Sequence, residues 1–132
     1  MIDHVSIQVS DLEQSAAFYE AVLAPLGLTR FVERPGTVGF GKRYPEFWLN
    51  CRPDGQRQPA GTGAHICLRA PDAEAVTAFH TAALAHGGVS DGAPGPRPAA
   101  VTSYFGAFVL DPDGNKIEAA AFPRKTEGSS AT

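Results

Sequence analysis

The chain has 132 residues, of which 43% are hydrophobic and 19% charged, and its formal net charge is −3. One domain of this size can bury a core without crosslinks. No apolar run approaches the roughly 18 residues of a membrane span, and the first residues do not resemble a signal peptide. Mild acidity without a Lys/Arg cluster argues against nucleic acid or membrane partners, and two cysteines are too few for a disulfide scaffold. The composition predicts a single-domain cytoplasmic protein.

The first half of the chain predicts one strand, one helix and three further strands. Apolar and polar side chains alternate over residues 4–9, which is typical of a strand with one buried face. A helix follows, with Ser10 and Glu13 as a capping box and an apolar stripe that ends near Gly27. The remaining predicted strands cover residues 31–33, 38–41 and 46–51.

The second half opens in the same way. Residues 65–70 alternate again, Asp72 is the expected cap of a second helix, and Gly87-Gly88 is expected to stop it. The side chains expected to face the core from this helix are Val76, Phe79, Ala83 and Leu84.

Two more strands are expected in the second half, at residues 104–110 and 116–122. They flank Asp111-Pro112-Asp113-Gly114-Asn115, a strong hairpin signal. Residues 91–100 are rich in Pro and Gly and predict an irregular loop, and the tail, 123–132, is expected to be flexible.

The two halves are copies of one module. A shift of 61 residues lays His4 on His65, and the same shift matches Asp11 with Asp72 and further Glu, Phe and Gly residues without a gap. We therefore predict an α+β protein with a single domain over 1–122. It consists of two βαβββ modules, at about 1–58 and about 62–122.

The strand faces that point away from the helices carry mixed side chains. Such a surface makes a poor core and a plausible cavity wall. Its members are His4, Ser6, Gln8, Glu46, Trp48, Asn50, His65, Cys67, Arg69, Lys116 and Glu118.

Three of these residues suggest a metal site. His4 and His65 occupy equivalent positions, and Glu118 faces the same way from the last strand. Two imidazoles and one carboxylate suit a divalent Fe, Mn, Zn, Ni or Co ion and leave open positions for a substrate. The alternative is structural: each His satisfied by backbone at a strand end, and Glu118 paired with Lys116 on the surface.

Three segments resemble the vicinal oxygen chelate superfamily, which includes glyoxalase I, bleomycin-resistance proteins and extradiol dioxygenases. They are IDHVSIQVSDLEQSAAFYEAVL, GAHICLRAPD and FVLDPDGNKIEAAAF. The resemblance implies a cupped sheet around a metal whose ligands are His4, His65 and Glu118, with Glu118 as the candidate catalytic residue. It also implies a homodimer, with the modules pairing within one chain or between two.

Glyoxalase I members also use a Glu on the last strand of the first module, and here this position aligns with Trp48. Trp cannot bind a metal, so the departure counts against ordinary glyoxalase I chemistry. It leaves the three-ligand set seen in extradiol dioxygenases and fosfomycin-modifying enzymes. A register slip of two residues would bring in Glu46 instead.

Other polar residues are candidates for a substrate pocket, each with a structural alternative. Trp48 suits either a pocket floor or the core, and the Tyr104 hydroxyl suits either a substrate oxygen or a structural bond. Arg69 and Arg97 suit an anionic substrate group or solvent. Cys67 lacks an accompanying base and is not expected to be a nucleophile.

The sequence therefore favours a metal-dependent enzyme of dioxygenase, lyase or transferase type that acts on a small oxygen-bearing molecule. The competing hypothesis is a metal-free protein of the bleomycin-resistance type that binds a drug or other small ligand. A groove floored by Trp48 would suit that role.

Overall fold

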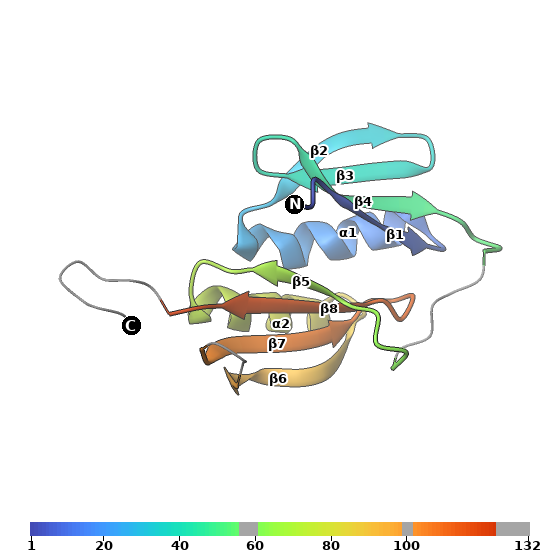
Figure 1. Cartoon of the computed structure of the whole chain (residues 1–132). Coiled ribbons are helices and arrows are strands. Elements are labelled where there is room, and N and C mark those ends of the chain that lie inside the picture. Colours follow the sequence, from blue (N-terminus) through green and yellow to red (C-terminus); the bar gives the residue numbers. More distant parts are fainter. Residues whose placement is uncertain (56–60, 99–101, 124–132) are drawn as a thin grey trace.

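Two four-stranded mixed sheets, each with one α-helix, form the structure (Figure 1). The computed structural model describes residues 1–55, 61–98 and 102–123. The elements of the first module are β1 (Val5–Val9), α1 (Leu12–Leu23), the 3-10 helix η1 (Ala24–Leu26), β2 (Thr29–Arg34), β3 (Thr37–Gly41) and β4 (Pro45–Cys51). Those of the second are β5 (Ile66–Arg69), α2 (Ala73–Ala85), β6 (Val89–Arg97), β7 (Tyr104–Leu110) and β8 (Lys116–Ala121).

The two sheets have the same topology. The strand order is β1-β4-β3-β2 in the first and β5-β8-β7-β6 in the second. In each, the opening strand pairs in parallel with the closing strand, and the other pairs are antiparallel. This confirms the predicted fold class of two βαβββ modules. The opening strands β1 and β5 each lie at an edge of their sheet.

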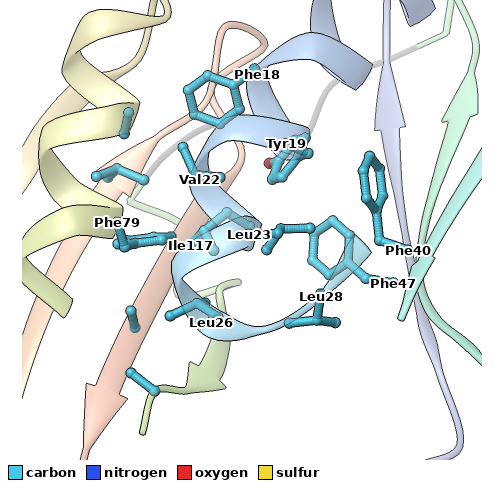
Figure 2. Close-up of a cluster of buried hydrophobic side chains, with 14 of the residues drawn as sticks. Phe18, Tyr19, Val22, Leu23, Leu26, Leu28, Phe40, Phe47, Phe79 and Ile117 are labelled. Carbon is cyan, nitrogen blue, oxygen red and sulfur yellow. The ribbon is translucent and has the colours of Figure 1, made fainter. Parts of the chain in front are cut away.

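Helix α1 contributes side chains to the core of both modules. Figure 2 shows Leu23 between Phe47 of the first sheet and Ile117 of the second. Phe79 of α2 lies beside Ile117, on the side of the cluster that belongs to the second module, and all four side chains are at most 1% exposed. Apolar burial on this scale is the main force that stabilises a domain, and here it also joins the modules.

Aspartate caps both helices at equivalent positions. Asp11 accepts a hydrogen bond from the backbone N–H of Gln14 at 3.0 Å, and Asp72 accepts one from Ala75 at 2.9 Å. The capping box predicted at Ser10 is wrong. Ser10 lies one residue before the cap, and its hydroxyl donates to Asp113 at 2.6 Å.

The hairpin between β7 and β8 braces the second module against the first. Asp111 is 3% exposed and accepts from the Tyr19 hydroxyl at 2.6 Å, as well as from Asn115 and the backbone of Asp113. Asn115 also donates to the backbone oxygen of Gln8 at 3.0 Å. The predicted hairpin is confirmed, and it serves as a contact between modules.

Two other predictions for the second module are wrong. The segment predicted to be an irregular loop, residues 91–100, lies largely within β6. This strand pairs only with β7 and has two register shifts, and an edge strand with bulges tolerates Pro and Gly. Leu84 is 48% exposed and does not face the core, because its neighbour Ala83 takes the buried position.

The predicted flexible tail lies outside the described residues, apart from Pro123. None of the helices in the described part of the chain combines the length and the apolar character needed to cross a bilayer.

Candidate functional site

The second sheet carries a cluster of chemically active side chains on the face turned away from α2. Ile117 and Ala119 of β8 are fully buried in the core, so the intervening Glu118 points to the opposite face. We call this face the open face of the second sheet. It is formed by His65, Cys67, Arg69, Arg97, Tyr104, Gly106, Phe108, Lys116 and Glu118.

Glu118 lies at the centre of this cluster. The residue is 3% exposed, and three side chains contact its carboxylate. His65 Nε2 lies 3.2 Å from Oε1, the Tyr104 hydroxyl donates to Oε2 at 2.5 Å, and the Cys67 thiol is also hydrogen-bonded to it. No ion pair with Lys or Arg accompanies Glu118 in the described residues.

The Glu118 carboxylate and burial together keep the Tyr104 hydroxyl and the Cys67 thiol protonated. The hydrogen bond to Glu118, followed by burial, raises the pKa of Tyr104 to about 12. Burial, followed by the charge of Glu118, raises the pKa of the Cys67 thiol to about 12. Both groups are proton donors at neutral pH. The prediction that Cys67 is not a nucleophile agrees with this environment, because the thiolate is the reactive form.

A glycine allows Tyr104 to reach Glu118. A Cβ atom on Gly106 would lie 2.8 Å from Cε2 of the Tyr104 ring and 3.3 Å from Oε2 of Glu118. Any larger residue there would displace the ring or the carboxylate. Gly106 therefore keeps the space that the hydrogen bond needs.

The cations of the open face lie over aromatic rings. The Arg69 guanidinium is 4.8 Å from the centre of the Phe122 ring, and both Lys116 and Arg97 lie over Phe108, at 4.9 and 5.7 Å. Such contacts fix the position of a long side chain and leave its charge accessible.

His4 lies apart from this cluster. It immediately precedes β1, its side chain is 53% exposed, and its Nδ1 is 2.8 Å from the carboxylate of Asp3. Within residues 1–55, 61–98 and 102–123, no three His, Cys, Asp or Glu side chains are grouped as metal ligands. A single chain thus brings His65 and Glu118 together, and does not add His4 to them.

The first sheet carries a tryptophan where the second carries Glu118. Ser6 pairs with Trp48 in the first sheet, and its counterpart Cys67 pairs with Glu118 in the second. Trp48, and not Glu46, is therefore the structural equivalent of Glu118. Glu46 instead accepts a hydrogen bond from the backbone N–H of Lys42 at 3.1 Å.

A cavity of about 360 Å³ lies beside His65, between the two modules. It is lined by Ser6, Ile7, Gln8, Ala64, His65, Ile66, Gly114, Asn115, Lys116 and Ile117. A second cavity, of about 390 Å³, lies at the far end of the second sheet and is lined in part by Tyr104 and Phe122. Of the predicted pocket residues, Tyr104 lines one of these two cavities, and Trp48, Glu46, Arg69 and Arg97 line neither.

Sequence reasoning missed two aromatic residues and one glycine of the site. Phe108 and Gly106 lie at alternate positions of β7 with Tyr104, so the period of the strand would have revealed them. Phe122 follows the last residue of β8, but the predicted strand 116–122 includes it at the parity of Glu118, so the same period would have revealed it. His80 of α2 is 9% exposed, and its Nε2 lies 2.8 Å from the Ser90 hydroxyl.

A family model described as the Glyoxalase/Bleomycin resistance protein/Dioxygenase superfamily matches residues 1–119. The chain belongs to this superfamily. The match spans both modules and includes all three predicted ligands, and it confirms the resemblance found in the sequence. No curated protein sequence matches the chain.

Solved structures of the superfamily have the same fold. A glyoxalase/bleomycin resistance protein from Albidiferax ferrireducens T118 is 35% identical, with a TM-score of 0.83 over 92% of this chain and 99% of that one. Two more distant structures show likeness of fold alone. A lactoylglutathione lyase from Agrobacterium tumefaciens is 21% identical (TM-score 0.62, 92% of each chain). A fosfomycin resistance protein from Listeria monocytogenes is 17% identical (TM-score 0.67, 93% of each chain).

Proposed function

We propose that the protein is a metal-dependent enzyme of this superfamily and acts as a homodimer on a small oxygen-bearing substrate. His65 and Glu118 of one chain and His4 of a second copy would hold a divalent Fe, Mn, Zn, Ni or Co ion. The observation that carries the proposal is the buried Glu118 carboxylate, which faces an imidazole at 3.2 Å without a cationic partner in the described residues. A buried carboxylate is stable only when its charge is compensated.

The donor set suits such an ion. Imidazole nitrogen and carboxylate oxygen are ligands of these metals, and a site of three protein ligands leaves room for substrate. Trp48 at the equivalent position in the first module supports three ligands over four. When bound, the ion would act as a Lewis acid on a substrate oxygen.

The chain's own residues then have distinct tasks. Tyr104 and Cys67 each hold a proton against Glu118 and so fix the orientation of its carboxylate. Two cavities, of about 360 Å³ beside His65 and about 390 Å³ beside Tyr104, are large enough to admit a small substrate, since sites for small ligands start at about this size. The three-ligand set favours dioxygenase-like or transferase-like chemistry over isomerisation of a glutathione adduct.

The edges of the sheets support completion of the site by a second copy. Strand β1 is hydrogen-bonded only to β4, and β5 only to β8, among the described strands. Each therefore presents a free edge, and His4 and His65 immediately precede these two strands. A two-fold dimer that places β1 of one copy against β5 of the other brings the two histidines toward one site. The free thiols of Cys51 and Cys67 support a location in the reducing cytoplasm.

Metal content tests the proposal directly. Protein purified without chelator is expected to contain one ion per chain by elemental analysis, and the His65→Ala and Glu118→Ala variants are expected to lose it. His86→Ala is a suitable control, because His86 is exposed at the C-terminal end of α2 and its Nδ1 contacts the Ala82 carbonyl. Wild-type protein that is metal-free and cannot be loaded would overturn the proposal.

A mixing experiment tests the second copy. His4→Ala and Glu118→Ala homodimers should each lack metal, but half of the randomly exchanged dimers would contain one intact site. We expect co-refolded variants to recover about a quarter of the wild-type metal. Recovery of none, with both variants folded, would place all three ligands in one chain. Metal in the His4→Ala homodimer, and recovery of about half in the mixture, would exclude His4.

The second candidate is a metal-free binding protein of the bleomycin-resistance type. Trp48 favours it, because its ring packs on Gly39, where a Cβ would lie 2.9 Å from the ring, and gives the first sheet an apolar surface. Saturable ligand binding by metal-free protein, unaffected by His65→Ala, would support this candidate over the enzyme.

A further inference from the structure

Arg69 differs in its contacts from the other cations of the open face. Lys116 forms an ion pair with Asp91 at 3.1 Å, and the Arg97 guanidinium donates to the backbone oxygen of Ala93 at 2.5 Å. Among the described residues, no acceptor lies within hydrogen-bonding distance of the Arg69 guanidinium. Its N–H groups are therefore available to a ligand.

A stack of side chains connects Arg69 to Glu118. The guanidinium lies over the Phe122 ring at 4.8 Å, and this ring stacks on Tyr104 with centres 5.0 Å apart and planes at 24°. The hydroxyl of Tyr104 in turn donates to Glu118. A guanidinium stacked on a ring keeps its planar fork of donors exposed at the edge and loses little freedom on binding.

An apolar cavity adjoins the same stack. Its volume is about 390 Å³, and most of its wall is apolar, with Tyr104, Phe105 and Phe122 as the aromatic members. Its polar members include Ser103 and Asp72, whose carboxylate caps α2. Phe122 is 36% exposed, so part of its ring is accessible to a ligand. A cavity of this size can hold the body of a small organic molecule.

We propose that the ligand of this region is a small carboxylate with an apolar body, whose carboxylate binds Arg69 and whose body lies against Phe122 in the apolar cavity. The fork of Arg matches a carboxylate in shape and charge. That this ligand is also a substrate rests on the proposed function, because the stack connects Arg69 to Glu118, one of the proposed metal ligands. A neutral molecule of the same shape would leave the Arg69 charge uncompensated.

Phenylacetate and its neutral analogue phenylacetamide are suitable probes. Chemical-shift titration of the full chain is expected to show saturable binding of phenylacetate at a site that includes Phe122, with phenylacetamide weaker by about tenfold or more. Arg69→Gln should reduce phenylacetate binding by the same factor and leave phenylacetamide unchanged. Phe122→Ala should weaken both probes.

Arg43→Gln is the matched control, because Arg43 is an exposed arginine in the turn between β3 and β4. It should leave both probes unaffected. Equal binding of the two probes, equal effects of the two arginine variants, or no saturable binding of phenylacetate would each overturn the proposal.

Chelator treatment separates this proposal from the proposed function. Preference for phenylacetate that persists in metal-free protein supports Arg69 as the anion site, even if the chain never binds a metal. Preference that disappears with the metal would mean that the ion bound the carboxylate. That result would overturn the Arg69 site and leave the metal proposal intact.

Discussion

The two modules have the same topology but carry chemically different side chains at equivalent positions of their sheets. On the closing strand, the first module has Trp48 and the second has Glu118. On the neighbouring strand, the partner of Trp48 is Gly39, whereas the partner of Glu118 is Phe108. The equivalent place thus holds an indole ring packed on a glycine in the first module and a buried carboxylate in the second. The chemical groups are concentrated in the second module.

One carboxylate holds the turn before each closing strand, Glu46 in the first module and Asp111 in the second. Asp111 is the buried one of the two, and its loss gives the largest expected effect. Asp111→Ala should lower the free energy of unfolding by about 3 kcal/mol, because it leaves buried donors, including the Tyr19 hydroxyl, without an acceptor. Glu46→Ala should lower it by less than about 1 kcal/mol, because only the Lys42 N–H is affected, at the surface. Urea denaturation measures both, and equal losses would contradict the comparison.

The second prediction concerns the acid–base chemistry of the open face. Glu118→Gln should lower the pKa of Tyr104 from about 12 toward its ordinary value near 10, because the neutral amide no longer favours the protonated hydroxyl. Absorbance titration of tyrosinate measures the shift, with Tyr104→Phe identifying the signal.

The same shift has a consequence for stability. Because the folded pKa of Tyr104 is raised, its contribution is fully present below about pH 10 and is lost as the pH rises toward about 12. In Glu118→Gln, this alkaline loss should shrink. An unchanged titration would mean that Tyr104 is not bonded to Glu118 in solution.

The third and smallest effect compares the two cysteines, one in each module. In a Cys51→Ser background, Cys67 should react slowly with iodoacetamide at pH 8 although the residue is exposed, because its pKa is about 12. Adding Glu118→Gln should accelerate the reaction by about tenfold. Cys51 in a Cys67→Ser background is the control and should not respond to that change.

Much of the fold was predictable because its signals are local. The alternation in both opening strands, the glycines after the helices and the Asp111–Asn115 hairpin each depend on neighbouring residues, and the structure has all of them. The cap of α1 was missed by one residue, since Ser10 and Asp11 have the same local preference. Only the contact of Ser10 with Asp113, in the other module, selects between them. The strand β6 was missed because its stability comes from pairing with β7.

The sequence alone determined the repeat, the family and the three candidate ligands, because residue identity and period along one chain carry that information. Only the tertiary structure decided which groups meet. Glu118 contacts His65, Tyr104 and Cys67 because parallel pairing of β5 with β8, and antiparallel pairing of β7 with β8, place distant residues side by side. His4 remains apart because it precedes the edge strand of the other sheet. The distance between two modules depends on how their helices pack, and no local pattern encodes it.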